Sequence, residues 1–466
     1  MVVPLVTAPY LSRVLGAEGL GVYAYLYSVA QYFVYFGILG IYSYGNRGIA
    51  KVRDNIQERN YFFSCVYTLQ LITSLVAIVA YIIYCSVFIH QNQATAYLLS
   101  LFVFSVVFDI NWFFWGIENF KVTVTRQIVV KIGTTIGIFI FVRTPSDLCK
   151  YTLILSVGTF LSNFYLFLYM NKYVSIKLVN FSKAFVHYKA IFILAIPIIA
   201  TSIYRVMDKI MIGILCNTRE VGYYEYSDKL IATSMGIIGA LGSVMLPKMA
   251  NLVSKGAAKE QKRYLIKSMK FTMFLSCAIS FGFFSISDVF IPFFYGEDFL
   301  PCIKITKILC FSVPFIAWAN VVRMQYLIPN EKDKTYVCSI ILGAFFNIIT
   351  NYILIPYYGA YGAAIGTVLA EALVMLTQTI ISVKELPLGS FLKVSIPYLF
   401  IGIAMFISAR LLLNLFNYTI KGMITTIILS GLFYLFLSFV YFLVTRCRLR
   451  LSGNYVYFRN KDRNQD

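Results

Sequence analysis

Apolar runs of roughly 20 residues recur from one end of this 466-residue chain to the other. That length is what an α-helix needs to cross a hydrocarbon core of about 30 Å. The composition agrees, because 59% of the residues are hydrophobic and only 13% are charged, whereas about 25% are charged in a soluble domain. A membrane β-barrel would show alternating segments of about ten residues, which this sequence lacks. We therefore expect an all-α polytopic membrane protein.

The apolar runs predict about fourteen transmembrane helices, so that both termini lie on the same side of the membrane. No cleavable signal peptide is recognisable at the start. The first run is short for a spanning helix, and we expect about ten further residues to precede it. The expected ranges are 1–15, 20–44, 61–89, 95–116, 119–142, 148–171, 190–215, 221–246, 268–295, 300–328, 334–355, 358–382, 391–416 and 422–445.

Basic residues gather in alternate loops and in the tail, which accounts for the net charge of +20 without a nucleic-acid partner. The loops on the opposite side hold only Arg143, Lys150, Arg219 and Lys421. By the positive-inside rule, this asymmetry places both termini in the cytoplasm.

Cysteine and histidine do not form a recognisable site. The nine cysteines stand singly, mostly within apolar runs, and the two histidines, His90 and His187, are far apart. The sequence therefore predicts no metal site, no disulfide framework and no cofactor.

An internal repeat relates two parts of the chain. Placing Gly222 on Gly21 also places Tyr224 on Tyr23 and keeps an aromatic-rich pattern in register. Parallel repeats of this kind build two-lobed transporters that rock about a central cavity; chance similarity of aromatic-rich helices is the alternative. The repeat predicts an N-terminal six-helix lobe at 1–171 and a C-terminal six-helix lobe at 190–382. An additional helix pair at 391–445 and a basic cytoplasmic tail at 446–466 would follow.

The stretches "GLGVYAYLYSVAQYF", "GNRGIAKVRD", "DKIMIGIL" and "VGYYEYSDKL" resemble those of the bacterial polysaccharide flippases, the Wzx-type O-antigen translocases. Their superfamily also holds multidrug extruders and lipid II flippases. The resemblance implies a flippase of the bacterial inner membrane that moves undecaprenyl-diphosphate-linked oligosaccharide to the outer leaflet. The cargo would be a repeat unit of O-antigen (the polysaccharide of lipopolysaccharide), capsule or exopolysaccharide. It also implies a polysaccharide polymerase and a chain-length regulator as candidate partners.

Ionisable residues inside the apolar runs are the candidate site, because a charge at the centre of a spanning helix costs about 2.5–3.5 kcal/mol. Basic residues predominate among them, and a cationic cavity suits a diphosphate. The expected substrate-binding residues are Arg205, Lys209, Arg126, Lys131 and Arg323, and the expected supporting or ion-coupling carboxylates are Asp208, Asp109, Asp228 and Glu371.

A purely structural role is the alternative for each of these residues. Arg205 and Asp208 are three residues apart and Glu225 and Lys229 are four apart, so each pair can neutralise itself on one helix face. Long basic side chains near helix ends also reach the interface.

Two other functions remain open at this point. A multidrug or metabolite antiporter of the same fold would line its cavity with carboxylates and aromatic rings. A membrane polysaccharide polymerase would need a large external loop, and a glycosyltransferase a carboxylate-rich cytosolic site. Neither enzyme feature is visible in the sequence, so we expect a transporter and not an enzyme.

Overall fold

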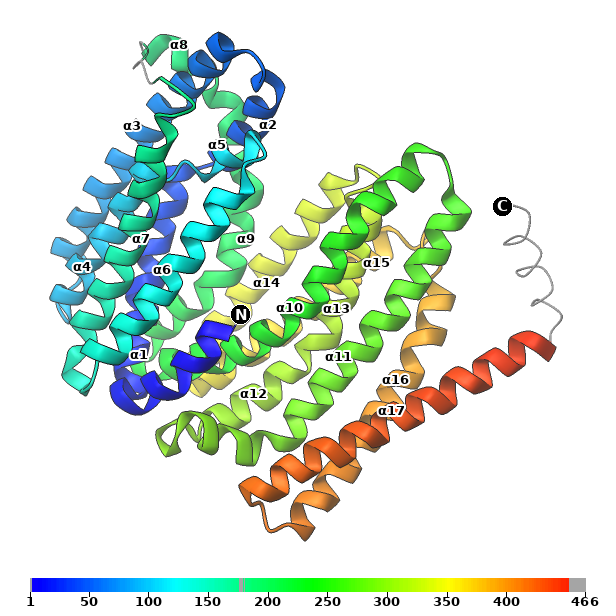
Figure 1. Cartoon of the computed structure of the whole chain (residues 1–466). Coiled ribbons are helices and arrows are strands. Elements are labelled where there is room, and N and C mark those ends of the chain that lie inside the picture. Colours follow the sequence, from blue (N-terminus) through cyan, green and yellow to red (C-terminus); the bar gives the residue numbers. More distant parts are fainter. Residues whose placement is uncertain (1, 176–178, 180, 452–466) are drawn as a thin grey trace. The chain divides into compact units, whose positions relative to one another are not determined.

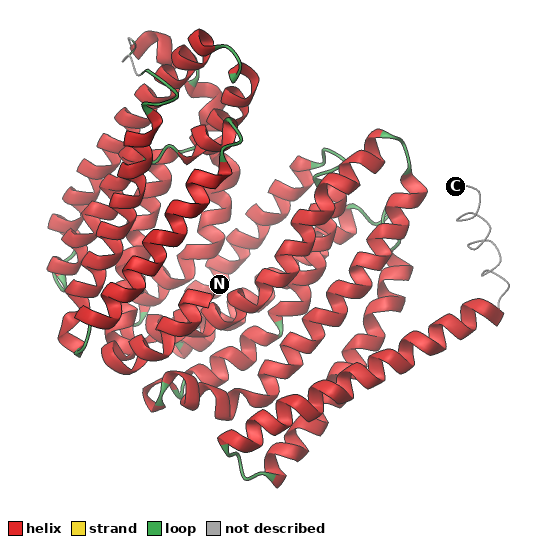
Figure 2. Ribbon diagram, viewed as in Figure 1, coloured by secondary structure: helices red, strands yellow, loops and turns green. Residues whose placement is uncertain are grey.

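The computed structural model of the chain describes residues 2–175, 179 and 181–451 (Figure 1). Every regular element among these residues is helical (Figure 2), which confirms the all-α prediction. The chain forms two compact units. The first unit takes Met1–Tyr226, Tyr295–Pro301 and Ile340–Gly366, and the second takes Ser227–Phe294, Cys302–Ser339 and Thr367–Asp466. The predicted lobe boundaries stay a prediction.

The described residues contain 12 helical runs that are long and apolar enough to cross a membrane, or 13 if a bent pair counts as one span. The bent pair is Tyr188–Ile203 with Val206–Leu215, at an angle of 52°. This count is slightly below the predicted fourteen, because the expected segments 1–15 and 20–44 lie in one run, Val6–Val52. The polytopic membrane architecture is confirmed.

Gly16 divides the first helix of the first unit. Its φ of 66° is left-handed, a conformation that glycine adopts without strain. The elements that belong wholly to this unit are α1 (Val2–Ile38), α2 (Ile41–Val52), α3 (Ile56–Phe88), α4 (Gln93–Phe104), η1 (Ser105–Phe108), α5 (Asn111–Gly116), α6 (Phe120–Phe141), η2 (Pro145–Asp147), α7 (Leu148–Met170), α8 (Phe181–Phe185), α9 (Tyr188–Leu215) and η3 (Glu297–Phe299).

The core of the first unit is built around Trp112 of α5. A Cβ on Gly45 of α2 would lie 2.4 Å from the Trp112 ring, so only glycine lets α2 and α5 pack this closely. Phe63 of α3 stacks on the same ring at a centroid distance of 5.2 Å. The Trp112 indole nitrogen donates to Gln70 Oε1 at 2.9 Å, so the only polar atom of this buried ring is satisfied.

Four further helices, α10, α11, α14 and α15, contribute to both units, and the remaining elements belong to the second unit. A π-helical turn at Arg323–Leu327 interrupts the α-helical pattern after α13, and such turns often mark functional positions. The elements are α10 (Thr218–Ser254), α11 (Ala258–Tyr295), α12 (Cys302–Cys310), α13 (Ser312–Val322), η4 (Arg323–Leu327), α14 (Asp333–Tyr358), α15 (Ala360–Ile381), α16 (Leu388–Leu415) and α17 (Ile420–Leu451).

The core of the second unit contains Trp318, whose indole nitrogen donates to Thr379 Oγ1 at 3.0 Å. Phe391 of α16 meets the Trp318 ring edge-on at 5.6 Å. Large apolar side chains also remain outside this core: Phe436 of α17 is 62% exposed and Phe400 of α16 is 68% exposed. Exposed apolar side chains on long helices fit contact with lipid, as expected for spanning segments.

Candidate functional site

Asp109, between η1 and α5, accepts hydrogen bonds inside the first unit. The Tyr42 hydroxyl donates to Asp109 Oδ2 at 2.5 Å, and Asn111 Nδ2 donates to Asp109 Oδ1 at 2.6 Å. The backbone nitrogen of Asn111 adds a weaker contact at 3.3 Å. These donors satisfy the acceptor oxygens of a carboxylate in a place where a charge without hydrogen-bond partners would be costly.

Arg126 of α6 is joined to Asp109 through the same asparagine. Its Nη2 donates to Asn111 Oδ1 at 3.0 Å, and its Nη1 donates to the Ser162 carbonyl at 2.8 Å and to Asn163 Oδ1 at 3.2 Å. The side chain is only 7% exposed. Among the described residues no carboxylate lies within ion-pair distance of this guanidinium. Arg126 is therefore a buried cation held by neutral acceptors.

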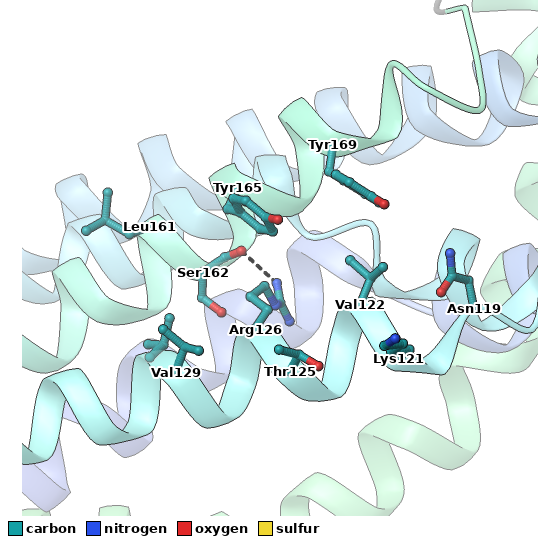
Figure 3. Close-up of a pocket in the computed structure, with 11 residues that line it drawn as sticks. Asn119, Lys121, Val122, Thr125, Arg126, Val129, Leu161, Ser162, Tyr165 and Tyr169 are labelled. Carbon is teal, nitrogen blue, oxygen red and sulfur yellow. Dashed lines mark hydrogen bonds between the residues drawn. The ribbon is translucent and has the colours of Figure 1, made fainter.

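A cavity of about 710 Å³ opens beside Arg126 between α6 and α7 (Figure 3). Apolar side chains form much of its wall, and two tyrosines and a lysine add polar groups. Tyr165 and Leu161, at 52% and 53% exposed, show that the cavity is open to the surroundings of the unit. The lining residues are Asn119, Lys121, Val122, Thr125, Arg126, Val129, Val130, Leu161, Ser162, Tyr165 and Tyr169.

The structure does not bring Lys131 to this cavity. Lys131 lies on α6, five residues after Arg126, which turns it to a different face of the helix. Its side chain is exposed. The two residues that the sequence grouped together therefore have different surroundings.

Asp208, in the middle of the stretch "YRVMDKIMIG", is a buried carboxylate of the first unit. It is 4% exposed. The Tyr224 hydroxyl of α10 donates to Oδ2 at 2.5 Å, and Asn351 Nδ2 of α14 donates to Oδ1 at 2.6 Å. Asp208 thus ties α9 to the next helix, α10, and to α14, whose Asn351 is 143 positions away.

Lys209 forms an ion pair between helices: its Nζ lies 2.5 Å from Glu225 Oε2 of α10. The sequence offered pairing within one helix as the alternative, with Glu225 meeting Lys229 and Asp208 meeting Arg205. The observed Lys209–Glu225 contact joins α9 to α10. The side chain of Arg205 lies outside the described residues.

The tyrosines of the repeated motif are engaged in packing. Tyr23 stacks on Tyr27 at 5.5 Å and meets the edge of Tyr151 of α7 at 4.8 Å. Tyr224 and Tyr226 are 2% and 3% exposed. A Cβ on Gly213 would lie 2.2 Å from the ring of Tyr25, so glycine allows α9 to approach α1.

The other predicted residues lie in the second unit. The Arg323 guanidinium lies 5.7 Å from the centre of the Tyr336 ring, a cation–π distance. Asp228 on α10 and Glu371 on α15 are both half-buried. The nine predicted site residues are therefore divided between the two units.

The second unit also contains a charged cluster that the sequence analysis did not predict. Asp288 of α11 receives Lys307 Nζ of α12 on Oδ1 at 2.6 Å and Arg410 Nη1 of α16 on Oδ2 at 2.5 Å. Two cations share one carboxylate, which leaves one net positive charge. Asp288 and Arg410 could have been recognised in the sequence, because they are ionisable residues within apolar runs.

Asn111 and Asn163 of the first unit could not be recognised in the same way, because their side chains are uncharged.

Within the described residues no group of His, Cys, Asp and Glu side chains could hold a metal ion. The arrangement instead offers Arg126, a buried cation oriented by hydrogen bonds, beside a cavity with apolar and tyrosine walls. Such a site can receive an anionic group attached to an apolar chain.

Comparison with known proteins shows what the chain is similar to. Residues 1–253 match the sequence model of a family described as polysaccharide biosynthesis proteins. The chain is 21% identical over 380 residues to a protein assigned as an O-antigen transporter in Shigella dysenteriae, with 80% of this chain and 94% of that relative covered.

Solved structures show the same fold. A lipid II flippase, MurJ, in an inward closed conformation superimposes with a TM-score of 0.77 and 19% identity, covering 95% of this chain and 96% of that chain. A multidrug resistance transporter of the MATE family, in an inward-facing conformation, gives a TM-score of 0.60 and 15% identity, with 85% of this chain and 98% of that chain covered.

Proposed function

The chain belongs to the polysaccharide biosynthesis protein family, and from that premise we propose that it is a flippase for polyprenyl-diphosphate-linked oligosaccharide. The cargo is a repeat unit of O-antigen, capsule or exopolysaccharide, carried from the cytoplasmic to the outer leaflet by alternating access. The similarity to an O-antigen transporter and the fold shared with a lipid II flippase support this cargo class.

Arg126 is the observation that carries the proposal. Its five N–H groups make three hydrogen bonds to neutral acceptors, and its Nε–H has no acceptor among the described residues. A planar guanidinium with free donors grips phosphate oxygens in two places at once. The α6–α7 cavity beside it has apolar walls for the first isoprene units and Lys121 near the helix start.

Lys209 contributes in a different way. Because Glu225 neutralises it at 2.5 Å, Lys209 binds a diphosphate only when that partner is displaced. Partner exchange of this kind couples cargo binding to a movement of α9 against α10. We assign Asp208 to the support of Lys209, and we keep Arg205, Lys131 and Arg323 as further candidate residues for binding the cargo. Asp109, Asp228 and Glu371 are the candidates for ion coupling.

The basic loops support an orientation with both termini in the cytoplasm. In this orientation α6 begins at the cytoplasmic face, so the cavity lies in the leaflet where the lipid-linked cargo is made. A polysaccharide polymerase and a chain-length regulator, which act after translocation, are the proposed partners in the bacterial inner membrane.

An antiporter for drugs or metabolites is the second candidate, because the fold is shared with a MATE transporter. Cationic drugs would need available carboxylates. Both Asp109 and Asp208 are instead engaged by hydroxyl and amide donors, which weighs against this cargo.

Deletion of the gene in its own host separates these candidates. The flippase proposal expects lipid-linked oligosaccharide to accumulate in the cytoplasmic leaflet and drug sensitivity to stay unchanged. Complementation with the intact chain should restore surface glycan, while an Arg126→Met variant at equal membrane abundance should not. Drug hypersensitivity without glycan accumulation would favour the antiporter.

A further inference from the structure

Four separate turns of the chain meet at one end of the first unit. They are the kink at Gly16, the start of α10, the η3 turn and the turn at Gly359 before α15. Two of the contacts there join residues near position 17 to residues beyond position 217, that is, they join the two halves of the internal repeat.

The repeat-related glycines Gly21 and Gly222 lie against each other at this end. A Cβ on Gly21 would lie 1.7 Å from the Thr218 carbonyl oxygen and 2.8 Å from Gly222 N. A Cβ on Gly222 would lie 2.1 Å from the Ala17 carbonyl oxygen. The helix that follows Gly16 therefore touches α10 through bare backbone, as small residues allow.

Asp298, in the η3 turn, holds the start of that helix. Its Oδ2 accepts the Ala17 N–H at 2.8 Å, although the two residues are 281 positions apart. The first N–H groups of a helix have no partner within the helix, so Asp298 acts as a cap supplied by a distant segment. Arg219 Nη2 donates to Asp298 Oδ1 at 2.5 Å and so orients the carboxylate.

A second carboxylate repeats this arrangement. Glu220 Oε2 accepts the Ala360 N–H at 2.9 Å, at the start of α15. A Cβ on Gly359, whose φ is 55°, would lie 2.7 Å from Glu220 Oε2. This contact fixes the start of α10, so that Gly222 and Arg219 are presented to the opposite half.

We propose that Asp298 is the latch of a gate at the end of the first unit away from the basic loops, and that Gly21 and Gly222 are the surfaces it holds together. This inference rests on the proposed function, in which the two repeats separate at that end to release cargo. Asp298 and Arg219 are 39% and 55% exposed in their side chains. Exposed pairs bind weakly, so the latch holds the closed state and still opens reversibly.

The latch is tested by a distance measurement that needs no cargo. Spin labels are placed on native Cys216, which is exposed, and on a Glu18→Cys substitution beside Ala17, with Cys149, Cys338 and Cys447 changed to serine. Double electron–electron resonance in liposomes should give one short distance for the intact latch. Asp298→Ala should raise a second, longer population roughly twofold to fivefold.

Two further variants and one control sharpen the result. Asp298→Asn keeps an acceptor for the Ala17 N–H and should lie between the parent and Asp298→Ala. Arg219→Gln should resemble Asp298→Asn, because the carboxylate remains but loses its orientation. Glu297→Gln should match the parent, because Glu297 is an exposed carboxylate next to Asp298 whose side chain makes no hydrogen bond or ion pair among the described residues.

If Asp298→Ala and Glu297→Gln give the same distance distribution, the proposal that Asp298 is a latch is wrong. If Asp298→Ala does not fold, unchanged distributions in both Asp298→Asn and Arg219→Gln would overturn it equally. Loss of glycan transport is not a readout here, so failure of the latch and failure of the flippase proposal stay distinguishable.

Discussion

Lys209 and Glu225 form an ion pair across two helices, with Nζ 2.5 Å from Oε2 and side-chain exposures of only 18% and 23%. Removing one member of a largely buried ion pair takes away the charge that compensates the other member. In fully buried pairs, such a change lowers the free energy of unfolding by about 3–5 kcal/mol. Replacing both members by apolar residues of similar size is often close to neutral.

Lys209→Met should therefore lower the free energy of unfolding by about 1–3 kcal/mol, a value reduced for partial exposure. The double variant Lys209→Met, Glu225→Leu should recover most of that loss. Thermal unfolding in detergent, analysed as a double-mutant cycle, measures the coupling. A loss in the double variant equal to the sum of the losses in Lys209→Met and Glu225→Leu would show that the pair is not energetically coupled.

Asn111 should be important for stability despite being uncharged. It donates to Asp109 and accepts from Arg126, so Asn111→Leu removes a hydrogen bond from the half-buried carboxylate and one from the buried guanidinium. We expect this variant to lower the free energy of unfolding by about 2–3 kcal/mol. Gln91→Leu, at an exposed amide, is the matched control and should change the unfolding midpoint little. A similar unfolding midpoint for Asn111→Leu and Gln91→Leu would contradict the claim that the hydrogen bonds of Asn111 stabilise the fold.

Gly21 and Gly239 should respond oppositely to alanine. A Cβ at Gly21 meets backbone at 1.7 Å, whereas a Cβ at Gly239 of α10 meets nothing within 4 Å. Gly21→Ala should lower the free energy of unfolding by about 1–3 kcal/mol or more. Gly239→Ala should raise it by up to about 1 kcal/mol, because alanine has the higher helix propensity. Membrane abundance and thermal unfolding report both. Normal stability of Gly21→Ala would argue against the close helix contact.

His187, just before α9, predicts a pH effect. Its Nδ1 lies 2.6 Å from the Tyr44 hydroxyl, and burial lowers the pKa of the imidazole. The folded state therefore favours the neutral ring. Its contribution to stability is present above the unfolded pKa of about 6.5 and is lost as the pH falls through the lowered folded pKa.

The unfolding midpoint should thus fall more between pH 7.5 and pH 5 in the parent than in His187→Gln, which cannot take up this proton. The comparison is made in detergent at constant ionic strength. A larger fall in the variant would mean that the protonated ring is the stabilising form.

Much of the fold could be predicted because hydrocarbon thickness fixes helix length, and apolar runs are visible in the sequence. Gly21 and Gly222, which the predicted repeat aligns with each other, lie in contact. The partners of the charges could not be predicted, because they come from distant helices: Asp208 is held by Asn351, which is 143 positions away. Short-range spacing cannot reveal a contact between helices such as that of Lys209 with Glu225.

The same limit applies to Asp298 and Asp288. Each accepts from segments that only the folded chain brings near. Neutral side chains such as Asn111 and Asn163 carry no charge signal, so the network around Arg126 is visible only in the structure.

Leaflet translocation in proteoliposomes tests the central claim most directly. The purified chain is reconstituted with a fluorescent polyprenyl-diphosphate oligosaccharide, and the fraction exposed to a membrane-impermeant quencher is followed with time. The account predicts that the parent moves the lipid between leaflets without changing its mass, that Arg126→Lys retains partial activity and that Arg126→Met falls at least about tenfold. Equal rates for Arg126→Met and the parent would contradict the role of Arg126, and no translocation by the folded parent, or a product of altered mass, would contradict the flippase assignment itself.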